Sequence, residues 1–203
     1  MNEPFRVPDA LFPCESVFDI PQLKPELQAE FVDLPVSGWG STSRKDRMRG
    51  TWHFYVDDEK FNRLWKHPET LLKTKAIGAV EVNFSTNDQM PFAVGIYRIF
   101  QKRWLSRYWQ SYGMPLWVDL NVSSKFEEYN LIGVPRKWRP YATHAVDSRI
   151  DTLMHHADLA DLHSKGSFDM LVYGGSKGVA KVCEDNGWVH IRDARLEARD
   201  GSR

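Results

Sequence analysis

Three consecutive stretches, 77-IGAVEVNF-84, 91-PFAVGIYRIFQKRWLSRYWQSYG-113 and 115-PLWVDLNV-122, decide the fold. The first and the last are short runs rich in apolar and β-branched residues, which is typical of buried strands. The middle stretch is long enough for a helix, with Pro91 in its first turn and Gly113 just past its end, where these residues favour helix limits. A strand, a helix and another strand in this order predict a parallel β-α-β unit.

The same alternation continues on both sides of this unit. Upstream, 52-WHFYV-56 predicts a strand and 57-DDEKFNRLWKHPETLLK-73 a helix that Pro68 interrupts. Downstream, a short helical piece is expected through Glu127 and Glu128, and further strands and helices are expected at 140–146, 150–166, 168–175, 177–187 and 188–191. These five or six β-α units predict an α/β fold with a mainly parallel sheet, built as an open sheet or as a partial or distorted barrel.

The first part of the chain differs from this body in composition. Residues 1–37 hold seven acidic and two basic side chains, and their many prolines exclude long helices. We interpret residues 1–51 as an acidic, proline-rich N-terminal arm followed by the basic loop 38-GWGSTSRKDRMRG-50, and residues 52–203 as a single α/β domain. The whole chain has no net charge, so the remainder is mildly basic.

Composition also excludes several classes of protein. No apolar run approaches the length that spans a bilayer and no charged leader precedes one, so we expect a protein of the bacterial cytoplasm that does not bind membranes. Cys14 and Cys183 are too few for a disulfide framework, and no cluster of Cys and His has zinc-ligand spacing. We therefore expect neither a metal nor a cofactor.

Polar residues follow the predicted strands at the places where a parallel sheet forms its binding crevice. In such sheets ligands bind beyond the carboxyl ends of the strands. The candidate crevice residues are Ser85, Asn87, Asp88, Asp119, Asn121, Tyr173, Gly174, Gly175 and Lys177. Helix capping is an alternative explanation for Asn87 and Asp88. The predicted strand at 140–146 contributes either His144 or Asp147 to the crevice, and His53 is interpreted as a hydrogen-bonded interior group.

The turn 173-YGGSKG-178 is the most suggestive part of this set. Glycines between a strand and a helix let backbone amides approach an anion, while the helix dipole and Lys177 add favourable charge. The segment matches neither of the established glycine-rich phosphate motifs, and a tight turn alone also explains it. Both interpretations stay open at this point.

Basic residues occur in three places that bear on nucleic-acid binding. Within the long helix, Arg103 and Arg107 share the face expected to pack on the sheet, where an arginine must pair with an acid or extend to the edge, whereas Arg98 and Lys102 point elsewhere. The helix is therefore better explained as structural. The candidate nucleic-acid-binding residues lie in the basic loop and in 136-RKWRP-140; they are Arg44, Lys45, Arg47, Arg49, Arg136, Lys137 and Trp138.

Three segments resemble the family known as domain of unknown function 4417, which is found largely in phages, plasmids and related bacterial elements. They are 53-HFYVDDEKFNRLWKHPE-69, 90-MPFAVGIYRIFQKRWLSRYWQSYG-113 and 170-MLVYG-174, and the R-W-L-x-x-Y-W-Q core of the helix is the distinctive part. Members carry an acidic residue and a serine after the second strand; this chain keeps Ser85 but has Asn83. The resemblance implies a mobile-element setting and no established activity.

Two hypotheses of function follow, and they belong to different classes. The first is a nucleic-acid-associated accessory protein of a phage or plasmid, acting in replication or maintenance, with DNA as its partner. The second is an α/β enzyme that binds a nucleotide or another phosphate-bearing small molecule in the crevice at the carboxyl ends of the strands. An interaction module with an aromatic surface is a third option, and catalysis and oligomeric state are left open by the sequence.

Overall fold

The computed structural model describes residues 12–40 and 48–193 of the chain. Within them, one seven-stranded sheet has strand order identical to chain order, and every neighbouring pair is parallel. The strands are β1 (Val36–Gly38), β2 (Thr51–His53), β3 (Gly78–Val80), β4 (Leu116–Asp119), β5 (Pro140–His144), β6 (Asp169–Tyr173) and β7 (Val189–Ile191). The predicted mainly parallel α/β fold is confirmed.

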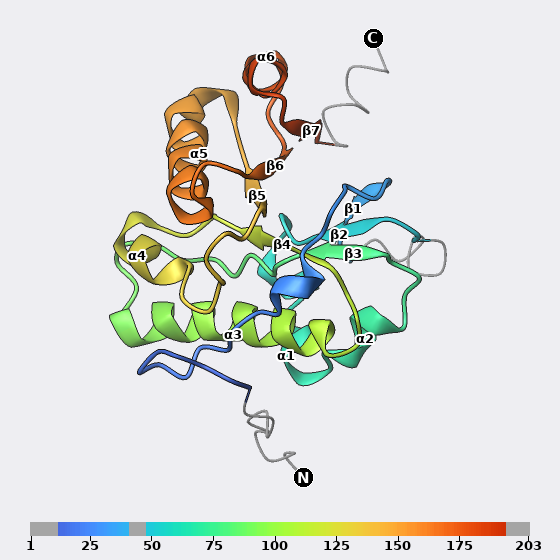
Figure 1. Cartoon of the computed structure of the whole chain (residues 1–203), viewed down its shortest axis with the longest axis vertical. Coiled ribbons are helices and arrows are strands. Elements are labelled where there is room, and N and C mark those ends of the chain that lie inside the picture. The colour runs from blue at the N-terminus through green and yellow to red at the C-terminus, as the bar shows by residue number, and fades with distance from the viewer. Residues whose placement is uncertain (1–11, 41–47, 194–203) are drawn as a thin grey trace.

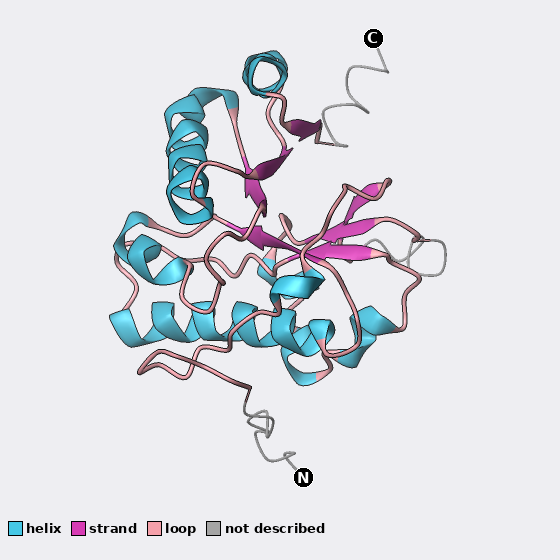
Figure 2. Ribbon diagram, viewed as in Figure 1, coloured by secondary structure: helices cyan, strands magenta, loops and turns pink. Residues whose placement is uncertain are grey.

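Helices connect the strands from β2 onward and lie outside the sheet (Figure 1). The α-helices are α1 (Arg63–Lys66), α2 (Glu69–Leu72), α3 (Phe92–Gln110), α4 (Glu127–Asn130), α5 (Ile150–Ser164) and α6 (Lys177–Asn186). The described residues also contain four short 3-10 turns, which are η1 (Pro25–Leu27), η3 (Asp58–Lys60), η4 (Ser124–Phe126) and η5 (Asp147–Arg149). Figure 2 shows the helices, strands and loops by colour. The predicted helix over 57–73 is divided into η3, α1 and α2, with Pro68 between the two α-helices.

The sheet curls strongly enough to form a nearly closed barrel. His53 of β2 and Tyr173 of β6 are four strands apart in the sheet order, a separation of about 19 Å in a flat sheet. Their ring centroids are nevertheless 4.0 Å apart. Because side chains from distant strands meet on one face, that face must be concave. Among the two alternatives that the sequence leaves open, the structure has the partial barrel.

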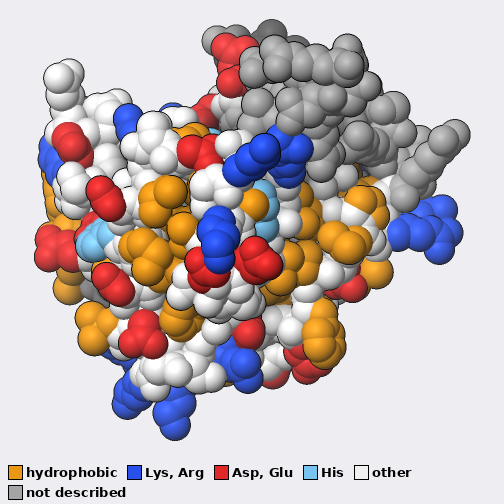
Figure 3. Space-filling model, turned by 90° about the horizontal axis from the view of Figure 1, so that it is seen from above, with side chains coloured by type: hydrophobic (Ala, Val, Ile, Leu, Met, Phe, Trp, Pro, Cys, Tyr) orange, Lys and Arg blue, Asp and Glu red, His pale blue; other side chains and the backbone are white. Residues whose placement is uncertain are grey.

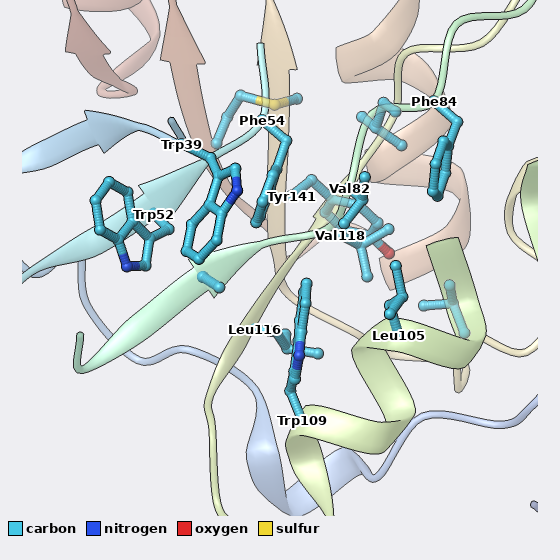
Figure 4. Close-up of a cluster of buried hydrophobic side chains, with 14 of the residues drawn as sticks. Trp39, Trp52, Phe54, Val82, Phe84, Leu105, Trp109, Leu116, Val118 and Tyr141 are labelled. Atoms are coloured by element: carbon cyan, nitrogen blue, oxygen red, sulfur yellow. The ribbon is translucent and has the colours of Figure 1, made fainter. Parts of the chain in front are cut away.

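Alternate residues along the strands face the two sides of this curved sheet. Val80, Trp117, Ala142 and Leu171 form a small buried cluster with no side chain from a helix, so they fill the concave face. Their neighbours along the strands pack outward against the helices. Figure 4 shows this outer core, where Leu105 and Trp109 of α3 point toward side chains of the sheet such as Leu116 and Val118.

The N-terminal segment is part of the folded body. Ile20 and Leu23 are buried, and the side-chain amide of Gln110, at the end of α3, donates to the carbonyls of Lys24 and Leu27 and accepts from the Lys24 amide. Residues 36–38 then form the edge strand β1, which the sequence had placed within an N-terminal arm. A strand of three residues is too short for its side-chain alternation to be recognised.

Buried neutral histidines make the stability of this fold depend on pH. Burial lowers the pKa of His163 to about 4 from an ordinary 6.5, and its Nδ1 lies 2.8 Å from the Tyr141 hydroxyl. Between these two values the unfolded chain binds a proton that the folded chain does not, so stability is present above pH 6.5 and is lost as the pH falls. Burial lowers the pKa of His53 and His156 in the same direction.

We predict that the free energy of unfolding falls between pH 7 and pH 5, by up to about 1.4 kcal/mol per pH unit for each histidine that titrates. Urea unfolding at several pH values measures this slope. His163→Gln should give a shallower slope than the wild type, whereas Leu162→Gln, at an exposed side chain that does not titrate, should leave it unchanged. Parallel slopes for all three proteins would contradict the assignment.

Candidate functional site

A crevice of about 320 Å³ opens at the carboxyl ends of the strands. Its walls come from residues at or after the ends of five strands, as expected for a site in a parallel barrel. They are Tyr55, Val56, Asp57, Asn83, Ser85, His144, Tyr173 and Asp193. Because the strands are parallel, residues far apart in the sequence reach the same end of the barrel.

Four aromatic rings, those of His53, Tyr55, His144 and Tyr173, form a group that we call the ring cluster. Tyr55 lies 5.6 Å from His53, 5.7 Å from His144 and 5.8 Å from Tyr173, measured between ring centroids. His53 and Tyr55 share one face because side chains two residues apart in an extended segment point the same way. Gly174, at a φ of +94°, is required beside the cluster, since a Cβ atom there would lie 2.8 Å from the His144 ring.

Both histidines of the ring cluster are neutral at physiological pH. Burial, together with the nearby His144, lowers the pKa of His53 to about 3, while the charge of Asp193 opposes the shift. The walls of the crevice also desolvate His144 and lower its pKa, against the opposing charges of Asp193 and Asp119. His53 Nδ1 accepts the Tyr55 amide at 3.2 Å, which places the proton of its neutral ring on Nε2.

Tyr55 is held in place by a buried carboxylate. Its hydroxyl donates to Asp119 Oδ1 at 3.1 Å, and burial together with this carboxylate holds the pKa of Tyr55 well above 10. Asp119 is fully buried and also accepts from Lys102 Nζ at 3.0 Å and from Asn121 Nδ2 at 2.7 Å. The Tyr55 hydroxyl also interacts with the Asn121 side chain, so its hydrogen bonds are made within the protein and fix the position of the ring in the crevice wall.

A second buried ion pair supports the first. Arg103 donates to Glu81 Oε1 at 2.6 Å and to the Asn130 carbonyl at 2.6 Å, and both charged side chains are fully buried. Glu81 Oε2 in turn accepts the Asp119 amide at 3.2 Å. Arg103 therefore pairs with an acid, as its position on the packed face required. Lys102 was expected to point away from the face that packs on the sheet. This prediction was wrong, because Lys102 is 2% exposed and paired with Asp119.

The structure brings five of the predicted crevice residues together. Ser85 and Tyr173 line the crevice, and Gly174 contacts His144. Asp119 and Asn121 lie behind it, connected through the Tyr55 hydroxyl. Sequence reasoning had given His144 as an alternative to Asp147 and had taken His53 as an interior group, and it missed Tyr55 and Asp193. The alternation of His53 and Tyr55 within one strand was the available signal.

Asn87 and Asp88 serve the local structure. Asn87 Oδ1 accepts the Gln89 amide at 3.1 Å. Asp88 accepts from the Ser124 hydroxyl at 3.2 Å and from the Lys125 amide at 3.2 Å, and so ties the loop before α3 to η4. Turn formation and loop bracing account for both side chains, and neither caps α3, whose N-cap is Pro91 without a side-chain hydrogen bond.

The glycine-rich turn after β6 already holds an anion, which the protein itself supplies. The Asp147 carboxylate accepts the Ser176 amide at 2.6 Å and the Val179 amide at 3.0 Å. Although burial acts to raise it, these hydrogen bonds hold the pKa of Asp147 below its ordinary value. The amides at the start of α6 are thus occupied, Gly175 is buried against Val179 and Lys177 is exposed, which favours the tight-turn interpretation over an anion site.

The predicted nucleic-acid residues are divided between three environments. Arg44, Lys45 and Arg47 lie outside the described residues. Arg49, Arg136 and Lys137 are exposed just before β2 and β5, which places them at the amino ends of the strands, opposite the crevice. The prediction that Trp138 contacts nucleic acid was wrong, because its side chain is fully buried and its indole N–H donates to the Pro140 carbonyl at 2.9 Å. Its ring is therefore not available to stack on a base.

The described residues contain neither a candidate metal centre nor a helix that could span a membrane. Residues 12–40 and 48–193 contain no group of three or more His, Cys, Asp and Glu side chains placed to hold a metal ion. None of the helices in the same ranges has the length and apolar character needed to cross a membrane. On the face seen from above, Lys and Arg side chains are interspersed with acidic and hydrophobic ones (Figure 3).

Comparison with known proteins shows similarity to phage proteins. The family model described as domain of unknown function (DUF4417) matches residues 12–140. The Gene 1 protein of Mycobacterium phage D29 is 32% identical over 198 residues, which cover 90% of this chain and 68% of that protein. The Gene 1 protein of Mycobacterium phage L5 is 33% identical over 108 residues, 51% of this chain and 46% of that one. No solved structure matches.

We predict that Lys102→Met destabilises the fold by about 3–5 kcal/mol, because it leaves the Asp119 carboxylate buried without its counter-ion. Adding Asp119→Asn should recover part of this loss, since the remaining amide carries no charge. Urea unfolding of both single variants and the double variant measures the coupling. The matched control is Lys181→Met, which breaks an exposed pair with Asp185 and should cost less than about 1 kcal/mol. Equal losses at the two lysines would refute a buried ion pair.

Proposed function

The chain belongs to the domain of unknown function 4417 family, which is phage-encoded, and from this premise we propose that it binds a small polar molecule in the crevice and performs acid–base chemistry on it. The observation that carries the proposal is the ring cluster. Two neutral histidines and a tyrosine anchored by a buried carboxylate meet at the carboxyl ends of the strands, and titratable groups with shifted pKa values gather at active sites.

His144 is the residue best suited to exchange protons with a ligand. It is exposed at the crevice, whereas His53 is 2% exposed and packed against Tyr173. A neutral imidazole accepts a proton at physiological pH, and the carboxylate of Asp193 would stabilise the imidazolium that forms. We assign His144 the role of general base and Tyr55 that of an aromatic wall that positions the ligand beside His144.

The charges of the crevice favour a neutral or cationic ligand with hydrogen-bond donors. Asp57 and Asp193 are among its lining residues, which include neither lysine nor arginine. A phosphate group in the same space would face two carboxylates without a lining cation. The small-molecule hypothesis therefore does not require a ligand that carries phosphate. Asn83 and Ser85 add neutral polar contacts to the crevice.

We expect His144→Gln to weaken ligand binding in the crevice by at least tenfold, or to abolish turnover, because the neutral amide cannot accept the proton. The measurement is a thermal-shift screen with free nucleobases, nucleosides, polyamines and neutral sugars, followed by affinity measurements on the compounds that raise Tm. Leu162→Gln, at an exposed position on α5, should bind like the wild type. Compounds that bind His144→Gln and wild type equally would refute the assignment.

Association with nucleic acid is the second candidate, favoured by the position of Arg49, Arg136 and Lys137. All three side chains are exposed, and all precede strands, so they lie at the same end of the barrel. Contacts between these cations and phosphates would act at the end opposite the crevice, and the two functions are compatible. Trp138 no longer contributes to this hypothesis, because it is buried.

If this second function exists, DNA affinity should fall steeply between about 50 mM and about 200 mM salt, because bound phosphates release counter-ions. Arg136→Glu combined with Lys137→Glu should reduce affinity at low salt and make the salt dependence shallower. Arg149→Glu, an equally exposed charge reversal near the opposite end of the barrel, is the control. Fluorescence anisotropy with single- and double-stranded oligonucleotides gives both quantities; no binding at low salt would exclude this function.

A further inference from the structure

A separate cavity of about 320 Å³ lies beside α1 and α2, outside the barrel crevice. Its walls are formed by Trp39, Lys60, Arg63, Leu64, His67, Glu69, Thr70 and Lys73. We propose that this cavity is a binding site for a phosphate group, carried by a nucleotide or by a nucleic-acid backbone. The inference does not depend on the function proposed for the crevice, with which it shares no lining residue.

The cavity is lined by three cations and one carboxylate. Glu69 is shared, since its Oε1 lies 3.6 Å from Lys73 Nζ and 3.8 Å from His67 Nδ1. Lys60 Nζ is 3.9 Å from Asp57, a long contact between side chains that are 40% and 80% exposed. Exposed pairs of this kind contribute little, so they do not neutralise the cavity for an incoming anion. Within the described part of the chain, the Arg63 guanidinium makes no salt bridge.

The base of the cavity is rigid. Trp39 and Leu64 are 3% and 1% exposed, and the Trp39 ring packs against Trp52 and Phe54 at centroid distances of 5.2 and 5.9 Å. An apolar base beneath charged walls suits a molecule with an anionic group and an apolar or aromatic body. Thr70 adds a hydroxyl donor at the wall, and a guanidinium such as that of Arg63 matches the geometry of phosphate oxygens.

The charge around the cavity extends along the same segment of the chain. Lys66 and Lys75 are exposed next to the lining residues, and Glu69 is the acidic residue between positions 60 and 75. A larger cavity, of about 740 Å³ at the amino ends of the strands, differs in this respect, because Glu26, Glu30 and Asp169 outnumber Arg139 there. The field of the protein therefore favours an anion beside α1 and α2.

The test is a titration of the full chain, followed by backbone NMR shifts of residues 60–73, with inorganic phosphate, a deoxynucleoside monophosphate and a single-stranded oligonucleotide as probes. Arg63→Glu should weaken binding at least tenfold. Glu69→Gln should strengthen it severalfold, because the carboxylate no longer competes for Lys73 and His67. Arg149→Glu, an exposed charge reversal on η5, should stay within twofold of the wild type. Thermal melts establish that each variant is folded.

The probes distinguish the source of the phosphate. Equal affinity for the mononucleotide and the oligonucleotide would identify a free nucleotide as the ligand, whereas tighter, salt-sensitive binding of the oligonucleotide would identify a nucleic-acid backbone. The proposal is overturned if none of the probes shifts residues 60–73 at low salt, or if Arg63→Glu and Arg149→Glu have the same effect. His144→Gln should bind phosphate like the wild type, which separates this result from that of the crevice.

Discussion

The pairing of two cations on α3 with two buried carboxylates, one directly after β3 and one at the end of β4, is the constraint on which the rest of the structure depends. Lys102 contacts Asp119 at 3.0 Å, and Arg103 contacts Glu81 at 2.6 Å. An unpaired charge in this interior would be strongly destabilising, so the long helix can pack on the sheet only where both pairs form. The same pairs fix Asp119, and Asp119 fixes the hydroxyl of Tyr55 in the crevice. Stability and the geometry of the candidate site therefore depend on the same contacts.

The curvature of the sheet brings side chains from distant strands together at one site. Because strand order follows chain order, successive right-handed units turn the sheet steadily and bring β2 and β6 face to face. The crevice then collects side chains from five strands and presents carboxylates and neutral rings. The basic residues considered for phosphate contacts lie elsewhere, at the amino ends of the strands and beside α1 and α2. Separate parts of the described chain thus present chemically different surfaces.

Carboxylates from distant parts of the chain account for several polar segments that a sequence pattern alone would assign to a ligand. Asp147 occupies the amides at the start of α6, Asp88 braces η4, and Asp58 accepts from both the amide and the hydroxyl of Ser85. In each case a carboxylate of the chain satisfies donors that would otherwise have been open to an anion. A glycine-rich turn becomes a ligand site only where such an internal partner is missing.

The sequence by itself determined the alternation of strands and helices, the limits of α3 and the carboxyl ends of the strands as the place to look for a site. These properties depend on neighbours within a few residues: Pro91 and Gly113 delimit a helix, and runs of β-branched residues form strands. Only the tertiary structure decided that β1 joins the sheet, that Trp138 and Lys102 are buried, and that Asp147, 29 residues upstream, occupies the Ser176 amide. The physical reason is that burial and hydrogen-bond satisfaction depend on partners distant in sequence, which no local pattern identifies.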